Sequence, residues 1–200
     1  MKLGIDIDDT TVDLANVMLK YAEKFDREVL GRKGINGDFG EIPNRYYLEA
    51  LFGWTQEEKY AFFNAYYKNV LEECIPLENS AETIRKLKEE GNEIYFITAR
   101  LNEIPNCDAE NITKMTLEKN NIPYNQLIMN AKHKLQFCIK HGISIFMDDS
   151  FDTCKELEEN GIKTFLMTTK MNQNIKTGEM ERVANWKEAY EKIKLFLRKD

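Results

Sequence analysis

The sequence predicts an α/β fold: a doubly wound, Rossmann-like parallel sheet with a small α-helical cap inserted after the first strand. Three observations predict it. Short, almost continuously apolar segments recur along the chain, as expected for strands that helices cover on both faces. From about residue 78 onward, helical patterns alternate with these segments. The interval between the first two strands is much longer than one crossover helix requires.

Five segments have the composition of buried strands. The first covers residues 3–8 and ends in acidic side chains. The other four are apolar from end to end: residues 94–97, 127–129, 145–147 and 164–167. Their alternation with helical patterns favours a mostly parallel sheet.

Helical patterns fill the intervals, and three of them have recognisable starts. Ser80 is expected to cap the helix before the second strand, and Asp108 the helix after it. The last helix is expected to begin at Asn185, with Glu188 in a capping-box position and Trp186 on the buried face. The two helices between the second and fourth strands are expected to bury residues at helical spacing: Ile112, Met115, Leu135, Cys138 and Ile139.

Residues 14–77 contain no convincing strand. One helical face is formed by Val12, Ala15, Leu19 and Ala22. A second is formed by Phe63, Tyr66, Tyr67, Val70 and Leu71, and a shorter helix is expected around residues 46–52. We therefore expect a core domain made of residues 1–13 and 78–200, and a helical cap made of residues 14–77.

Composition narrows the function. The 200 residues carry a net charge of −6, and the pI is about 5.2, which argues against a nucleic acid polymer as partner. The sequence contains no run of 18 apolar residues, so no membrane span is expected. Its acidic start is unlike a signal peptide, so a cytoplasmic protein is expected. Four widely spaced cysteines and two histidines do not suggest a zinc or redox site. Carboxylates, lysines and hydroxyls remain, and these suit Mg²⁺ and phosphate-type substrates.

Acidic residues collect where the predicted strands end. Asp6 and Asp8 close the first strand, Thr98 closes the second and Asp148 closes the fourth. Ligands of open α/β sheets bind at this carboxyl edge. The two-residue period of a strand sends Asp6 and Asp8 to the same side. Carboxylates gathered this closely repel unless a cation lies among them, and Mg²⁺ suits such a site.

These motifs resemble those of the haloacid dehalogenase-like hydrolase superfamily. Its first motif, DxDxT, is matched by DIDDT at residues 6–10, and its second, an apolar strand ending in Thr or Ser, by Ile97-Thr98. A lone lysine and the acidic pair Asp148-Asp149 match the third and fourth. GIDIDDT, FITAR, FMDDS and the closing Asn-Trp helix are most similar to the cytosolic type-C 5′-nucleotidase (deoxyribonucleotidase) branch.

The resemblance implies a two-step phosphoryl transfer. Asp6 would attack phosphorus and form an aspartyl-phosphate, and Asp8 would act as general acid and then as general base. Mg²⁺ would be held by Asp6, by the backbone carbonyl of Asp8 and by Asp148. Asp149 is a further metal candidate, whereas Asp152 is expected to lie in the first turn of the next helix.

The phosphate group would be bound by Thr98 and by the free backbone N–H groups of Asp9 and Ala99. Arg100 either contacts the phosphate as well or forms a surface ion pair. The lysine that offsets the charge of Asp6 is either Lys134, which begins a helix beside the sheet, or Lys132. His133, between them, is expected to be a solvated loop residue.

The predicted cap carries many aromatic residues, which either stack on a nucleobase or form a helix–helix core: Tyr46, Tyr47, Trp54, Phe62, Phe63, Tyr66 and Tyr67. Arg45 either meets a second phosphate or ribose, or is a solvated surface charge. The sequence thus predicts a Mg²⁺-dependent phosphomonoesterase whose partner is a small phosphorylated metabolite, with a 5′-nucleotidase as the first choice. The alternatives are a phosphatase of sugar phosphates, a non-catalytic nucleotide-binding relative and a receiver-type signalling module; no oligomeric state is indicated.

Overall fold

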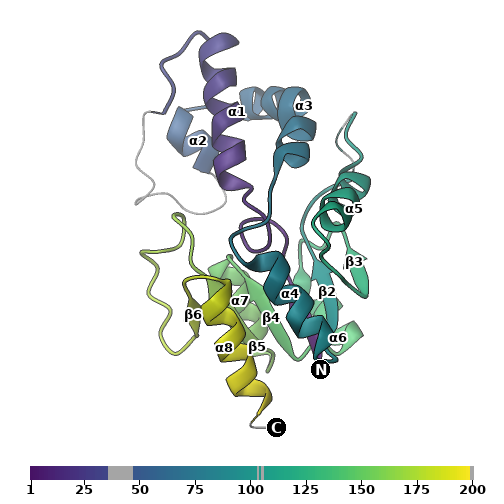
Figure 1. Cartoon of the computed structure of the whole chain (residues 1–200). Helices are drawn as coiled ribbons and strands as arrows, with labels where there is room; N and C mark the ends of the chain where they lie inside the picture. The colour runs from purple at the N-terminus through teal and green to yellow at the C-terminus, as the bar shows by residue number, and fades with distance from the viewer. Residues whose placement is uncertain (36–46, 103, 105, 199–200) are drawn as a thin grey trace.

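The computed structural model describes residues 1–35, 47–102, 104 and 106–198 (Figure 1). Within these residues, parallel strands form one sheet in the order β3-β2-β1-β4-β5-β6. The strands are β1 (Lys2–Ile5), β2 (Glu93–Ile97), β3 (Gln126–Ile128), β4 (Ile145–Asp148), β5 (Lys163–Met167) and β6 (Arg182–Val183). Strand order reverses beside the central β1, which confirms the predicted doubly wound α/β fold and places a switch point between β1 and β4.

Helices surround the sheet and extend beyond one end of it. They are α1 (Ala15–Glu28), α2 (Tyr47–Phe52), α3 (Gln56–Glu73), α4 (Ser80–Glu89), α5 (Ala109–Lys119), α6 (Lys134–His141), α7 (Phe151–Glu159) and α8 (Trp186–Leu197). Figure 1 shows α1, α2 and α3 grouped beyond the carboxyl ends of the strands, while the other helices flank the sheet. No helix in the described part of the chain combines the length and apolar character that a bilayer crossing requires.

The alternation of side chains along the strands separates two apolar layers. Alternate residues of the central strands pack with buried residues of α4 and α8, and the residues between them pack with α6 and α7. Gly4 permits one close approach: a Cβ at this position would lie 2.3 Å from Cδ2 of Phe146. The Phe146 ring therefore packs directly on the backbone of β1, two residues before Asp6.

The three helices beyond the sheet share an apolar core of their own. The Phe25 ring makes edge contacts with Trp54 and Phe62, with ring centroids 5.2 and 5.7 Å apart. Asp26 lies fully buried inside this core, where its carboxylate accepts hydrogen bonds from Trp54 Nε1 at 2.7 Å and from the backbone N–H of Gly34 at 2.9 Å. Both carboxylate oxygens are thus paired, as burial of a charge requires.

Two predicted helix starts are confirmed and one is wrong. Asp108 accepts from the N–H of Asn111, and Asn185 accepts from the N–H groups of two residues in α8. Ser80 is instead the first residue of α4: its side chain is buried and caps nothing, because Asn79, at φ 64°, occupies the N-cap position.

Two side chains predicted to point inward are exposed: Met115 on α5 and Ile139 on α6. The first strand is also shorter than predicted, since β1 ends at Ile5 and leaves Asp6 in the loop that follows. The two-residue strand β6 carries no periodic pattern and was not predicted.

Candidate active site

The loop after β1 brings acidic residues to the carboxyl edge of the sheet. Its turn is closed by the Thr11 hydroxyl, which donates to the carbonyl of Asp6 at 2.7 Å. Trp186 of α8 donates its indole N–H to the carbonyl of Thr10 at 2.8 Å. At the far end of the loop, Asp9 accepts from two backbone N–H groups at the start of α1, at 2.7 and 3.1 Å. The loop is thus held from the strand, from α8 and from α1.

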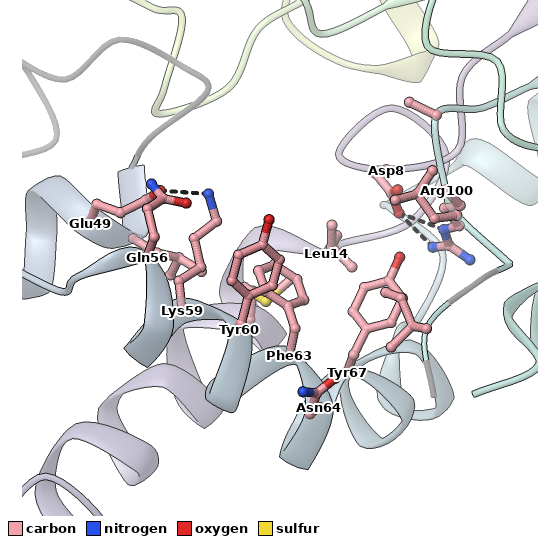
Figure 2. A pocket seen from close by; sticks show the side chains of 15 residues that line it. Asp8, Leu14, Glu49, Gln56, Lys59, Tyr60, Phe63, Asn64, Tyr67 and Arg100 are labelled. Atoms are coloured by element: carbon pink, nitrogen blue, oxygen red, sulfur yellow. Dashed lines mark hydrogen bonds and ion pairs between the residues drawn. The ribbon is translucent and has the colours of Figure 1, made fainter. Parts of the chain in front are cut away.

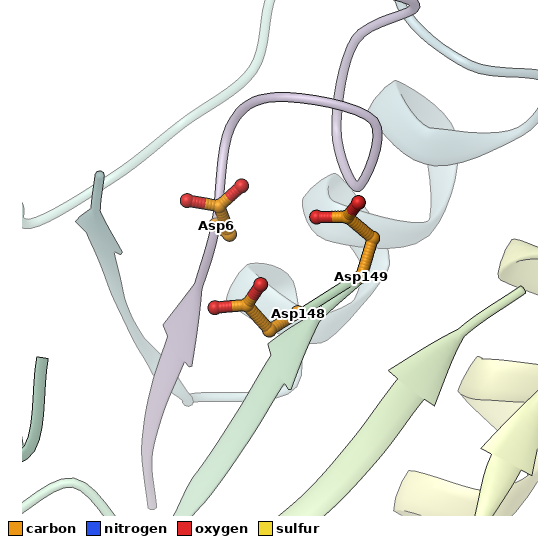
Figure 3. Close-up of side chains that lie close together, drawn as sticks. All are labelled: Asp6, Asp148 and Asp149. Atoms are coloured by element: carbon orange, nitrogen blue, oxygen red, sulfur yellow. The ribbon is translucent and has the colours of Figure 1, made fainter. Parts of the chain in front are cut away.

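Three carboxylates meet at this edge: Asp6 from the loop, Asp148 at the end of β4 and Asp149 directly after it (Figure 3). Each contributes one oxygen, and these oxygens all lie within 4.8 Å of one another. Asp6 and Asp148 are only 5% and 1% exposed, so water contributes little to the solvation of their charges.

Lys134 lies against two of these carboxylates. It is the first residue of α6, and its Nζ donates to Asp6 Oδ1 at 2.5 Å and to Asp148 Oδ2 at 2.7 Å. Lys132 and His133, in the preceding turn, are both exposed. Of the two lysines that the sequence left open, the structure brings Lys134 into contact with the acids.

The electrostatics of the cluster favour a bound cation. Burial raises the pKa of Asp6 to about 7, against the opposing charge of Lys134. Burial and the charge of Asp148 raise the pKa of Asp149 well above its usual range. Burial disfavours the charged ammonium of Lys134, but Asp148 and Asp6 outweigh this and raise its pKa. One ammonium cannot neutralise three carboxylates, and oxygen ligands in this number suit Mg²⁺.

Asp8 stands apart from this cluster. Its Oδ1 accepts two hydrogen bonds from Arg100, from Nε at 2.9 Å and from Nη2 at 2.5 Å. The third guanidinium nitrogen, Nη1, donates to the Thr113 hydroxyl of α5 at 2.8 Å. The strand ends before Asp6 and Asp8, so the strand period does not decide whether they share a side, but Asp8 is close enough for its charge to contribute to the raised pKa of Asp6. Arg100 is 3% exposed, so its ion pair with Asp8 is not a surface ion pair, and a contact of Arg100 with phosphate stays a prediction.

Of the three groups expected to bind phosphate at Thr98, Ala99 and Asp9, the first two remain able to donate to it and the third does not. Thr98 is buried at the end of β2, and its hydroxyl accepts from the N–H of Arg100 at 3.2 Å. Ala99 is exposed, and its N–H forms no hydrogen bond with the described residues. The N–H of Asp9 already donates to the carbonyl of Val12 at 2.8 Å, so the expectation of a free N–H there is wrong.

A cavity of about 620 Å³ opens from Asp8 and Arg100 toward the helices beyond the sheet (Figure 2). Figure 2 shows the Asp8–Arg100 ion pair at one end and a polar group at the other, with aromatic side chains between them. In the polar group, Glu49 Oε1 accepts from Lys59 Nζ at 2.5 Å and from Gln56 Nε2 at 3.2 Å. Sequence patterns gave no sign of this polar group, because its residues come from two different helices.

The aromatic residues of the predicted cap pack together, and some of them, Phe63 and Tyr67 included, also face the cavity. Trp54, Phe62 and Tyr66 make ring contacts within the helical core. Phe63 and Tyr67 line the cavity together with Tyr60, which is 68% exposed and was not singled out by the sequence. Arg45 and Tyr46 lie outside the described residues, as does the side chain of Tyr47. The helix–helix core expected for the aromatic residues is therefore confirmed, and stacking on a nucleobase stays a prediction for the residues that also line the cavity.

Comparison with known proteins agrees with this geometry. The family model described as "5' nucleotidase, deoxy (Pyrimidine), cytosolic type C protein" matches residues 1–199. Among curated proteins, a candidate nucleotidase of Bacillus cereus is 28% identical over 199 residues, covering 97% of this chain and 98% of the relative. A second candidate nucleotidase, from Halalkalibacterium halodurans, is 26% identical and covers 94% of this chain and 90% of the relative.

Solved structures resemble the fold at lower sequence identity. A predicted phosphatase from Clostridium acetobutylicum superposes with a TM-score of 0.68 at 15% identity, covering 97% of this chain and 98% of its own. A haloacid dehalogenase-like hydrolase from Streptococcus pneumoniae superposes with a TM-score of 0.63, also at 15% identity, covering 96% and 97%.

Proposed function

Since the chain belongs to the cytosolic type-C 5′-nucleotidase family of haloacid dehalogenase-like hydrolases, and is a phosphoric monoester hydrolase, we propose that it hydrolyses nucleoside monophosphates through an aspartyl-phosphate on Asp6. The observation that carries this proposal is the position of Asp6. Its carboxylate is held by Lys134 beside Asp148 and Asp149, and Asp8, two residues further on, lines the adjoining cavity.

In the first step, a carboxylate oxygen of Asp6 attacks phosphorus while the bond from phosphorus to the ester oxygen breaks. Asp8 gives its proton to the departing alcohol. In the second step, Asp8 takes a proton from water, the water oxygen attacks phosphorus, and inorganic phosphate leaves as the Asp6 carboxylate is restored. Arg100 holds Asp8 in place through two hydrogen bonds during both steps.

The three clustered carboxylates, with the backbone carbonyl of Asp8, would hold Mg²⁺, which supplies charge neutralisation for the phosphate group. The donors proposed for the phosphate oxygens are the Thr98 hydroxyl, the N–H of Ala99 and the Lys134 ammonium. Because the N–H of Asp9 is already paired, we assign Asp9 to the start of α1 rather than to phosphate.

A nucleotide fits the cavity better than a compact sugar phosphate does. Phe63 and Tyr67 offer flat surfaces beside Asp8, and ring stacking suits a nucleobase. The ester phosphate would lie toward Asp6, and the base would lie against these side chains. We propose that residues 14–77 act as the cap that selects substrate over a core of residues 1–13 and 78–200, and that the enzyme works in the cytoplasm on this small metabolite rather than on a polymer.

A substrate panel tests the proposal. With Mg²⁺, release of inorganic phosphate from 5′- and 3′-nucleotides, sugar phosphates and p-nitrophenyl phosphate is measured for the wild type, for Asp6→Asn and for Asp152→Asn as a control. We expect nucleotides to be preferred, Asp6→Asn to be inactive, and Asp152→Asn and the wild type to behave alike. A higher kcat/KM for sugar phosphates would overturn the nucleotide assignment. If p-nitrophenyl phosphate were hydrolysed equally with and without Asp6, the mechanism would be wrong.

A further inference from the structure

The segment between β5 and β6 is fastened to the carboxylate cluster by one fully buried side chain, that of Asn172. Its Nδ2 donates to the carbonyl of Asp149 and to the carbonyl of Met167, both at 2.7 Å. Its Oδ1 accepts from the N–H of Thr169 at 3.0 Å and from Arg182 Nη1 at 2.7 Å. The amide thus joins the ends of β4 and β5 to the segment itself and to β6.

Arg182 fixes Asn172 from the other side. Its Nη2 donates to the carbonyls of Asn172 and Ile175, at 3.1 and 3.0 Å. The side chain and the main chain of Asn172 are therefore both held by one guanidinium. This network uses the two donors of the amide and places two donors on its oxygen, so the orientation of the amide is determined.

Asp149 lies where the chain leaves the sheet, one residue after β4 and one before Ser150, the N-cap of α7. At this position no ladder hydrogen bond of the sheet holds its carbonyl, and Asn172 supplies the bond instead. The Asp149 carboxylate is separated from the main chain by a single methylene group, so holding the main chain limits the directions in which the carboxylate can point. The direction of the Asp149 side chain decides whether the third oxygen of the cluster reaches a cation.

We propose that Asn172 is a positioning residue that orients Asp149 to complete the divalent-cation site. This inference rests on the proposed function only in that it requires the carboxylate cluster to bind Mg²⁺. Asparagine suits the task because aspartate would place acceptors against the carbonyls of Asp149 and Met167, and alanine would leave both unpaired. Partners of metal-binding residues typically contribute 10- to 100-fold to metal affinity.

The test measures the Mg²⁺ dissociation constant of the full chain by titration calorimetry, together with the Tm of the metal-free protein. Asn172→Ala is compared with Asn92→Ala, which removes a buried asparagine that donates to the Leu87 carbonyl at 2.8 Å, outside the cluster. Both variants are expected to lower the Tm, but only Asn172→Ala should weaken Mg²⁺ binding, by about 10-fold or more. Arg182→Met, which loosens Asn172 without removing it, is expected to weaken binding less and serves if Asn172→Ala does not fold.

A double-mutant comparison separates positioning from a general loss of stability. In an Asp149→Asn background, Asn172→Ala should weaken Mg²⁺ binding no further, since the side chain that it orients is gone. If the wild type, Asn172→Ala and Arg182→Met all bound Mg²⁺ with equal affinity, the inference would be overturned and the proposed function would be left intact. A wild type that binds no Mg²⁺ would overturn the metal site, and the inference with it.

Discussion

Arg100 donates two hydrogen bonds to a single carboxylate oxygen of Asp8, across 92 residues of sequence. The same guanidinium also donates to the hydroxyl of Thr113, and that hydroxyl donates in turn to the carbonyl of Ala109 at 2.7 Å. Helix α5 is thereby connected through two side chains to the proposed general acid and base. Arg100 therefore supports Asp8 directly.

Replacement of Arg100 should therefore impair chemistry more than binding. We expect Arg100→Met to lower kcat on the order of 100-fold, within the range that general acid–base catalysis contributes, with a smaller effect on KM. Steady-state kinetics with the preferred nucleotide measure this. Arg85→Met, which removes a guanidinium that donates to the carbonyls of Asn120 and Asn121, is the matched control and should leave kcat unchanged. A kcat for Arg100→Met within threefold of the wild type would show that Asp8 needs no such support.

Lys134 and Lys132 provide a second matched pair. Lys134→Met removes the ammonium from between two buried carboxylates, and breaking a buried ion pair typically costs about 3–5 kcal/mol. We expect a lower free energy of unfolding in urea and loss of activity. Lys132→Met should change neither quantity, because its side chain is exposed. The opposite ranking would mean that the contact of Lys134 with the acids is not essential.

Asp149 should make the stability of the metal-free protein depend on pH. Burial and neighbouring carboxylates raise its pKa in the folded state, so the folded protein holds a proton that the unfolded chain releases. This contribution is present at about pH 4 and is lost as pH rises through the raised pKa. Asp149→Asn does not lose stability in this way, because an asparagine side chain does not titrate. Its Tm should therefore exceed that of the wild type by an increasing margin toward pH 8, at about 2–4 °C per kcal/mol.

Saturating Mg²⁺ should reverse that order at pH 8, because a ligand stabilises the state that binds it and the wild type binds it more tightly. Thermal melts with Mg²⁺ and with chelator measure both effects. A wild type whose Tm did not respond to Mg²⁺ at either pH would contradict the cation site.

The two tryptophans of the chain each donate one buried indole hydrogen bond, Trp186 to the Thr10 carbonyl and Trp54 to Asp26. Substitution by phenylalanine keeps a ring and leaves an acceptor unpaired, which costs about 1–3 kcal/mol. Both variants should melt at lower temperature. Only Trp186→Phe should also lower kcat for p-nitrophenyl phosphate, because Thr10 lies in the loop that carries Asp6 and Asp8. If Trp186→Phe and Trp54→Phe lowered kcat equally, Trp186 would have no specific role in holding the loop that carries Asp6 and Asp8.

The fold could be predicted because the buried strands leave a continuous apolar pattern. The strand ends alone predicted which polar residues gather at one edge of the sheet: Asp6, Thr98, Asp148 and Asp149. The pairing of Arg100 with Asp8 could not be predicted, since it depends on where the first strand stops and on the neighbouring helix. The start of α6 at Lys134 was expected although no side-chain cap marks it, but only the contacts of Lys134 with Asp6 and Asp148 distinguish it from Lys132.

The network of Asn172 shows the same limit more sharply. A polar residue in a loop has no period to reveal it, and its partners lie 3 to 23 residues away. The errors at Met115 and Ile139 arose differently, because helical spacing predicts a face but not its width. Sequence patterns thus located the reactive carboxylates and left their support to be found in the structure.

The central position of β1 has a consequence for biosynthesis. The first strand to leave the ribosome must wait for its two neighbours, which pair with it from residues 93 and 145 onward. Until then both of its edges remain open, and such late, long-range pairing slows folding and exposes a nascent chain to aggregation. The Trp186 contact adds a further requirement, because the loop with Asp6 and Asp8 gains its hydrogen bond from α8 only after residue 186 has been made. The loop with Asp6 and Asp8 should therefore gain its complete set of contacts only late in synthesis.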